Sequence, residues 1–350
     1  MKILVYTDNH YCQYSSIIHS RGEKYSKRLE NQIQTLNWIE ETAVNDKCDM
    51  IVCLGDFFDK AELNAEEITA LIDVKWSDLP HKFLVGNHEM GTNDLVYNST
   101  NILSKIGEII YQPKLNSVFG CDMLYLPYIL ESNRKPLSYY IEKATKEYYT
   151  GKFTTNECRN FVIFSHNDLS GIEYGFHTSK IGFDVNEINN SCQLYLNGHL
   201  HNQTQISSKI LNLGNVTGQN FSEDASKYEH CIAIVDTNTL NVDLIVNPYA
   251  FNFYKFEVNT IEELKIKLKN ILNNAIISLK APSSILGECR KLLDEDKNVV
   301  EYRAIMIPET SNVKIGQSEL TKLDHIEEFK KYVLNNIDNS EELLDELSLL

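Results

Sequence analysis

The chain has 350 residues, enough to bury a large hydrophobic core, and its formal net charge of −16 argues against a self-sufficient nucleic-acid-binding protein, which usually displays a basic surface. No apolar run reaches the roughly 20 residues of a membrane span, and the first ten residues lack signal-peptide features, so we expect a soluble, cytoplasmic protein without a membrane contact. The eight cysteines form no CxxC pair and are expected to be reduced and buried.

Strand-like apolar stretches alternate with helical patterns over residues 1–110. The strand candidates are KILVYTD, MIVCLGD and HKFLVGN, and helical spacing covers 24–45 and 62–78. This alternation predicts βαβ units and a mostly parallel sheet.

A second group of elements follows up to residue 250. It contains a β-rich passage at 109–129, a tyrosine-rich helix at 136–150 and the strands NFVIFSH and QLYLNGH. Residues 203–250 predict consecutive antiparallel strands, with DTNTLN as a turn. We therefore expect one α/β domain over 1–250, with two β-sheets flanked by helices.

The last hundred residues predict two smaller parts. Residues 251–310 contain three strand candidates, a helix at 261–274 and a short second helix, which indicates a small α+β cap. Residues 311–350 are acidic and helical in pattern. One apolar face of this tail is formed by Leu323, Ile326, Phe329, Val333 and Ile337.

Polar residues that could bind metal ions follow five of the predicted strands. A single aspartate or histidine there is usually a cap or loop residue, but ligands gather at the carboxyl ends of strands in α/β sheets. Carboxylate, amide and imidazole groups together suit manganese, iron or zinc. The five groups are Asp8-Asn9-His10, Gly55-Asp56-Phe57-Phe58-Asp59, Gly86-Asn87-His88-Glu89, Ser165-His166 and Gly198-His199-Leu200-His201.

The spacing within two of these groups predicts a site with two ions. In an extended backbone, residues i and i+2 face the same side, so His199 and His201 can share one site, and so can Asp8 and His10. Two-metal hydrolytic centres hold their ions about 3.5–4 Å apart, and Asp56 is the expected bridging carboxylate. Two divalent ions with two carboxylates leave a positive centre that attracts phosphate.

The ordered motifs DxH, GDxxD, GNHE, H and GHxH resemble the calcineurin-like metallophosphoesterase superfamily over residues 1–250. The resemblance implies a four-layer sandwich and two divalent ions, with Mn²⁺ favoured over Mg²⁺, Fe²⁺ or Zn²⁺. It implies His88 as the catalytic group that stabilises the transition state or protonates the leaving oxygen. Asp59 and Glu89 are expected to orient the ligands. It assigns one ion to Asp8, His10 and His201, the other to Asn87, His166 and His199, and Asp56 to both.

Within the superfamily, GDFFD, NLGNVTGQNFSED and the cap with its tail are similar to the SbcD family of DNA-repair exonucleases, the counterpart of the eukaryotic meiotic-recombination nuclease. This similarity implies a DNA exonuclease and endonuclease in a bacterial or phage-infected cell. It also implies an SbcC-type coiled-coil ATPase partner, bound by the tail, and a homodimer through helices after the third motif. The residues expected in that dimer, which core packing explains almost as well, are Leu95, Val96, Ile102, Leu103 and Ile106.

Other functions within the superfamily stay open. Glu89 is typical of Ser/Thr protein phosphatases, although GDFFDKAEL lacks the arginine with which those enzymes grip phosphate. A nucleotide phosphodiesterase and a non-catalytic scaffold are the further alternatives. A basic quartet predicts DNA contacts, or else a solvated helix start, and consists of Arg21, Lys24, Lys27 and Arg28.

Deletion of residues 318–350 is expected to abolish binding of the coiled-coil ATPase, because the tail would dock its apolar face in a groove of that partner. Manganese-dependent cleavage of short single-stranded DNA should persist. Co-purification and a gel-based nuclease assay measure the two results. Unchanged ATPase binding would place the docking site elsewhere and favour a tail that packs on the cap.

Overall fold

The computed structural model describes residues 1–118, 120–150, 160–174 and 177–307. Residues Met1–Ile307 belong to one structural unit. The predicted tail helices and their apolar face lie outside the described residues.

The first sheet has the strand order β18-β17-β1-β2-β3-β6. Strands β1, β2, β3 and β6 run parallel, and β17 and β18 extend the sheet antiparallel beside β1. β1 reads KILVY, and its last four residues are at most 1% exposed, as expected for a strand covered on both faces. The bounds are β1 (Lys2–Tyr6), β2 (Met50–Cys53), β3 (His81–Leu84), β6 (Gly107–Ile110), β17 (Cys231–Asp236) and β18 (Val242–Val246).

The second sheet has the order β15-β16-β14-β9-β8-β7. Its four central strands are parallel, and the edge strands β15 and β7 are antiparallel. The bounds are β7 (Lys114–Val118), β8 (Cys121–Leu126), β9 (Asn160–Ser165), β14 (Leu194–Asn197), β15 (Thr204–Gln205) and β16 (Ile210–Asn212).

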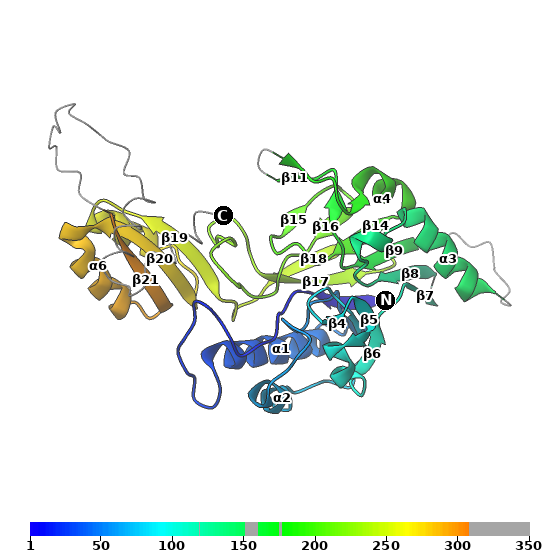
Figure 1. Ribbon diagram of the computed structural model, residues 1–350, viewed down its shortest axis with the longest axis horizontal. Helices are drawn as coiled ribbons and strands as arrows, with labels where there is room; N and C mark the ends of the chain where they lie inside the picture. The colour runs from blue at the N-terminus through cyan, green and yellow to red at the C-terminus, as the bar shows by residue number, and fades with distance from the viewer. Residues whose placement is uncertain (119, 151–159, 175–176, 308–350) are drawn as a thin grey trace, which may run out of the picture. The chain divides into compact units, whose positions relative to one another are not determined.

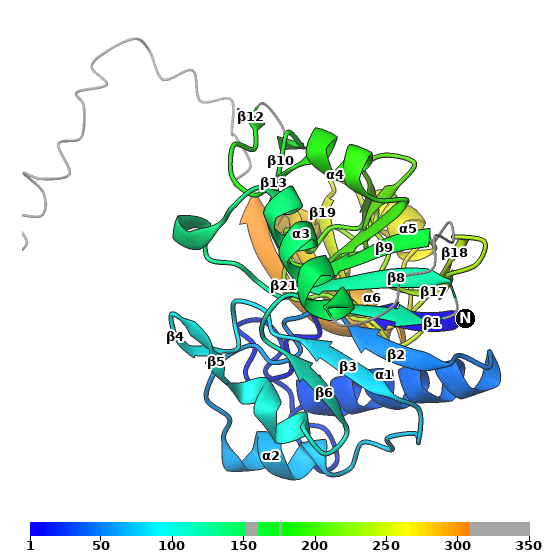
Figure 2. The ribbon, with the colours of Figure 1, turned by 90° about the vertical axis from the view of Figure 1, so that its right-hand side faces the viewer.

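The two sheets pack face to face, with helices on both outer faces (Figures 1 and 2). Between the sheets, Val52 and Leu84 pack with Tyr125 and Phe164. The predicted four-layer α/β sandwich is therefore confirmed. The first sheet is covered by α1 (Lys27–Asn45) and α2 (Ala65–Leu71), and the second by α3 (Leu137–Tyr149) and α4 (Val185–Ser191).

Local capping sets the ends of the first two helices. α1 begins at Lys27 because Ser26 accepts a hydrogen bond from the Leu29 amide at 3.2 Å. α2 begins after Asn64, which forms a capping box with Glu67. Both helices are shorter than the helical patterns predicted.

The segment after the third motif is not helical as predicted. It forms the hairpin β4 (Met90–Thr92) and β5 (Asp94–Asn98), followed by one 3₁₀ helix, η1 (Ser99–Leu103). Leu103 is buried in the core and Ile106 packs against it, whereas Val96 and Ile102 are exposed. The expected helical dimer surface is therefore wrong, and the homodimer stays a prediction.

The cap contains three parallel strands in the order β19-β20-β21, drawn in yellow to orange in Figure 1. A helix connects each strand to the next, so the cap is a small βαβαβ unit and not the α+β unit expected. Its own hydrophobic cluster includes Phe256, Leu264 and Leu293. The bounds are β19 (Asn252–Glu257), α5 (Ile261–Leu268), β20 (Ala275–Pro282), α6 (Ser283–Glu295) and β21 (Val299–Ile307).

Short elements complete the described chain. The expected turn DTNTLN lies between β17 and β18, which confirms that prediction. The remaining elements are η2 (Glu131–Asn133), β10 (Leu169–Ser170), β11 (Glu173–Tyr174), β12 (His177–Thr178) and β13 (Phe183–Asp184).

The described structure bears on two further predictions, the state of the cysteines and the lack of a membrane-spanning segment. All cysteines except Cys158, which lies outside the described residues, are buried and free of disulfides. Among the described residues, every helix is too short or too polar to cross a membrane.

The substitution Phe164→Ala is expected to lower the free energy of unfolding by about 3–5 kcal/mol, because it opens a cavity between the sheets. Phe164 is fully buried and stacks on Tyr125 at a ring-centroid distance of 5.3 Å. Urea denaturation measures the change. Tyr14→Ala, at a side chain 72% exposed, is the control and should change stability by less than about 0.5 kcal/mol. An equal effect of both substitutions would contradict the packing described.

Candidate metal centre

The predicted ligands come from the carboxyl ends of five strands in both sheets. β1, β2 and β3 of the first sheet lead into the DxH, GDxxD and GNHE motifs. β9 and β14 of the second sheet lead into His166 and the GHxH motif. The site therefore lies where the ends of the two sheets meet.

One cluster brings together Asp8, His10 and His201, with potential ligand atoms all within 4.8 Å of one another. The Nε2 atoms of His10 and His201 are 3.1 Å apart. They lie 3.8 Å and 4.0 Å from Asp8 Oδ1, which is buried without a hydrogen-bond partner among the described residues. The three atoms point at one position, as ligands of a common ion do.

A second cluster brings together Asp56, His166 and His199, with Asn87 beside them. His166 Nε2 lies 3.1 Å from Asp56 Oδ2, yet neither ring nitrogen of His166 makes a hydrogen bond to any described residue. His199 Nδ1 lies 2.9 Å from Asn87 Oδ1. Asp56 Oδ2 is also 3.9 Å from His10 Nε2, so Asp56 stands between the two clusters, where a bridging ligand was predicted.

Carboxylates hold the far nitrogens of three of these histidines. His10 Nδ1–H donates to Asp59 at 3.0 Å, His201 Nδ1–H to Glu223 at 2.8 Å, and His199 Nε2–H to Asp168 at 3.0 Å. Such partners orient metal-binding imidazoles and fix their tautomers. This role was predicted for Asp59 from its motif, whereas Asp168 and Glu223 were not predicted. Asp168 follows His166 by two residues, which is the one local signal that could have found it.

The donor set fits two divalent ions. With their far nitrogens protonated, the near nitrogens of His10 and His201 face each other with lone pairs, and that of His199 faces the amide oxygen of Asn87. Lone pairs at about 3 Å need a proton or a cation between them. A cation satisfies the orphaned oxygen of Asp8 and the orphaned nitrogens of His166 as well. Nitrogen and oxygen donors of this kind suit manganese, iron or zinc.

Four of the predicted ligands sit in left-handed backbone conformations. The φ angles are 51° at Asp8, 45° at His10, 47° at Asp56 and 73° at His199. The chain therefore turns as it leaves each strand, and the extended i, i+2 geometry predicted for the histidine and DxH pairs is wrong. Non-glycine residues in this region cost free energy and gather at functional sites.

Two motif glycines are required by close packing. A Cβ atom on Gly86 would lie 2.1 Å from Asp56 Oδ1, and one on Gly198 would lie 2.2 Å from the hydroxyl of Thr7. Thr7 in turn donates to Asp8. A side chain at either glycine would displace a predicted metal ligand.

His88 stands at the exposed side of the site. Its ring lies 4.6 Å from that of His10, and its side chain is 41% exposed. Nδ1–H donates to the carbonyl oxygen of Asp59 at 2.9 Å, so Nε2 is the atom free to exchange a proton. Glu89 is fully buried and accepts backbone N–H groups of Gly86 and Phe58 at 2.6 Å and 3.1 Å. It therefore orients the loops that carry ligands, and burial followed by the charge of Asp56 raises its pKa to about 7.

Opposite charges outweigh burial in the centre of the site. Burial opposes ionisation of Asp8, but His166 and His10 lower its pKa to about 2. Burial likewise opposes protonation of His10, but Asp59 and Asp8 raise its pKa to about 10. Against the same effect of burial, Asp56 and Asp8 raise the pKa of His166 to about 9. Protons and metal ions therefore compete for the same imidazoles.

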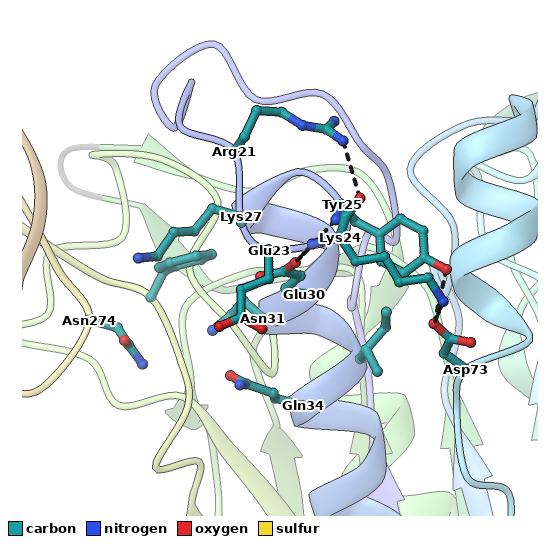
Figure 3. Close-up of a pocket in the computed structure, with 13 residues that line it drawn as sticks. Arg21, Glu23, Lys24, Tyr25, Lys27, Glu30, Asn31, Gln34, Asp73 and Asn274 are labelled. Atoms are coloured by element: carbon teal, nitrogen blue, oxygen red, sulfur yellow. Dashed lines mark hydrogen bonds and ion pairs between the residues drawn. The ribbon is translucent and has the colours of Figure 1, made fainter.

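Three residues of the basic quartet, Arg21, Lys24 and Lys27, line a cavity of about 780 Å³ beside the start of α1 (Figure 3). Arg21 pairs with Glu66, and Lys24 with Asp73, each at 2.7 Å. Arg28 is 3% exposed and bonds to protein groups, so its prediction as a DNA contact is wrong. The ammonium group of Lys27 has no polar partner among the described residues and faces the cavity.

A family model described as calcineurin-like phosphoesterase matches residues 1–203. The probable exonuclease subunit 1 of Escherichia phage T5 is 26% identical over 208 residues. The match covers 57% of this chain and 57% of the phage protein, so it spans little more than half of that relative. All seven predicted metal ligands fall within the range of the family model.

Solved structures similar to this chain include three proteins, each matched over 70% of the chain. A protein from Thermus thermophilus has a TM-score of 0.40 at 10% identity, with 98% of its chain covered. An archaeal phosphodiesterase has a TM-score of 0.35 at 13% identity, with 99% covered. A dimetal phosphatase from Danio rerio has a TM-score of 0.35 at 13% identity, with 98% covered.

Manganese binding is expected to release protons at neutral pH, because the ions displace protons that carboxylates hold on His10 and His166. Affinity should rise with pH and level off above about pH 10, the pKa of His10. Calorimetry in buffers of different ionisation enthalpy measures the release. Asp59→Asn removes the charge that holds the proton on His10 and should reduce the number of protons released. A binding heat independent of the buffer would contradict the proton competition.

Proposed function

Because the chain belongs to the calcineurin-like phosphoesterase family, we propose that it is a two-metal-dependent DNA nuclease that hydrolyses phosphodiester bonds. The observation that carries the proposal is the pair of neighbouring ligand clusters, in which Asp56 of the second lies 3.9 Å from His10 of the first, with the exposed imidazole of His88 beside them. The name of the phage T5 relative, an exonuclease subunit, supports nucleic acid as the substrate class.

The residues divide the chemistry between binding and proton transfer. Asp8, His10 and His201 would hold one ion, Asn87, His166 and His199 would hold the other, and Asp56 lies between the two sets. When bound, the ions stabilise the charge that develops on the phosphate. His88 donates its Nδ1–H to the carbonyl oxygen of Asp59, which leaves Nε2 free. In this proposal, Nε2–H protonates the leaving oxygen of the substrate.

Local charge explains how an acidic protein attracts DNA. Two divalent ions would bring four positive charges and their ligands Asp8 and Asp56 remove two, so the ions and these ligands together carry about +2. Asp59, Asp168 and Glu223 place three negative charges behind the imidazoles, one ring further from a bound phosphate. This field acts at the site itself, against the chain's net charge of −16.

Among the described residues near the site, no arginine is free to bind phosphate. This disfavours the protein phosphatase alternative. Arg134 contacts Asp168 at 3.5 Å, but its side chain is 5% exposed and is also held by Glu131. It therefore supports the ligand His199 through Asp168 and does not reach a substrate.

The proposal extends to manganese as the metal and to an SbcCD-type repair complex in the cytoplasm, with an SbcC-type ATPase partner. Its support is the sequence similarity of GDFFD and NLGNVTGQNFSED to the SbcD family. The tail deletion described above tests the partner separately from the chemistry.

His88→Ala is expected to lower manganese-dependent cleavage of linear duplex and single-stranded DNA by about 10²–10⁴-fold, the usual size of a general-acid contribution. Manganese affinity should stay unchanged, because the clusters keep their ligands. His199→Ala should instead weaken metal binding. Gel assays with end-labelled DNA and calorimetric titration measure the two effects.

The control for this experiment is His19→Ala, which removes an exposed imidazole outside the metal motifs and should change neither result. Full cleavage by His88→Ala would refute the assigned role. If a phosphoserine peptide or a small nucleotide diester is hydrolysed in preference to DNA, that compound class and not DNA is the substrate. Metal binding without any hydrolysis would favour the scaffold alternative.

A further inference from the structure

Residues 215–225, here called the bridging segment, contact the metal centre on one side and the cap on the other. At the metal side the contact is Glu223, which is 1% exposed. Its carboxylate accepts from His201 Nδ1–H at 2.8 Å, from the Asn215 side chain at 2.8 Å and from the Gln219 amide at 2.7 Å.

The surroundings of Glu223 require a carboxylate. The Asn220 side chain donates as well, at 3.4 Å, so every described partner is a donor, and a carboxylate has only acceptor oxygens. A glutamine would turn an NH₂ group toward at least one donor, and a buried unpaired donor is costly. The carboxylate thus keeps the proton on Nδ1 of His201 and directs Nε2 toward His10 and Asp8.

At the cap side, Phe221 fixes the bridging segment. Its ring meets that of Phe253 edge to face at 5.1 Å, and the guanidinium of Arg303 stacks on it at 4.4 Å. Two residues after Glu223, the amide of Ala225 donates to the Phe253 carbonyl at 2.8 Å. Ile276 belongs to the same apolar cluster, so all three cap strands contribute to this anchor.

A second connection links the bridging segment to the same ligand cluster through α1. Gln219 accepts a hydrogen bond from Arg28, whose guanidinium also donates to the His10 carbonyl at 3.2 Å. The bridging segment thus contacts His201 directly and reaches His10 through Arg28. The described contacts of the second cluster involve Asp168 and Asn87 instead.

We propose that Glu223 is a positioning residue for the ion held by Asp8, His10 and His201, and that the cap sets this position through Phe221. Displacement of the cap then weakens binding of that ion and leaves the other ion in place. The inference rests on the two-metal site of the proposed function but not on DNA as its substrate. It makes the cap a regulator of metal occupancy.

The test titrates the full-length protein with manganese alone and follows both binding steps by calorimetry. Glu223→Gln is expected to weaken one of the two steps by about 10–100-fold, as loss of such a partner does. His201→Ala identifies which step belongs to this cluster, and Asp168→Asn, the matched variant on His199, should weaken the other step. Phe221→Ala should weaken the Glu223-dependent step by about 2–30-fold, the range of coupling through packed residues.

Controls separate this effect from a general loss of structure. Leu293→Ala removes a buried side chain from α6, in the other cap cluster, and should leave both binding steps unchanged. Circular dichroism confirms folding of each variant, and Phe221→Leu replaces Phe221→Ala if the latter does not fold. Absorption spectra of cobalt-substituted protein should show a change at one ion only.

The outcomes are distinct. Equal weakening of both steps by Glu223→Gln, or none, overturns the positioning role. Unchanged binding in both Phe221 variants overturns the control by the cap. A protein that shows the expected pattern but does not cleave DNA refutes the proposed substrate and leaves this inference standing.

Discussion

Two carboxylates, Asp8 and Asp56, are buried in one small volume with a cluster of imidazoles. The surrounding structure offsets the unfavourable free energy of burying these charges. An isolated buried charge is highly unfavourable, whereas a paired and hydrogen-bonded charge is tolerated. The histidines supply that pairing, as the lowered pKa values of both aspartates indicate. Left-handed turns bring the groups into range, and Gly86 and Gly198 leave room for them.

The strands that carry the motifs, and the seven predicted ligands that the structure brings together, could be predicted from the sequence because both depend on short-range patterns. Apolar runs mark strands that are covered on both faces, and potential ligands follow five such runs, a recurrence that single cap or loop residues do not explain. The predicted reason for the pairing of His199 with His201 was nonetheless wrong. His199 takes a left-handed φ, and the Gly198 backbone next to it lies close to Thr7; no local sequence pattern reports either feature.

The features that the sequence did not reveal depend on contacts between distant residues. Glu223 accepts a hydrogen bond from a histidine 22 residues away, and the buried Arg28 donates one to Gln219, which is 191 residues away. A basic residue near a helix start gives no sign of such a partner. The hairpin after the third motif was missed for a different reason. Its mixture of apolar and polar residues fits a helix as well as short strands. The strands form because β4 and β5 pair with each other.

Each ligand cluster takes residues from both sheets, and this has a consequence for the nascent chain. Asp8, His10, Asp56 and Asn87 belong to the first sheet, whereas His166, His199 and His201 belong to the second. Neither sheet alone holds a complete set for either ion. The first sheet, moreover, is finished only when β17 and β18 join β1. A partly synthesised or half-folded molecule therefore lacks both ligand clusters, and ions bound there would join the two sheets only after these have docked correctly.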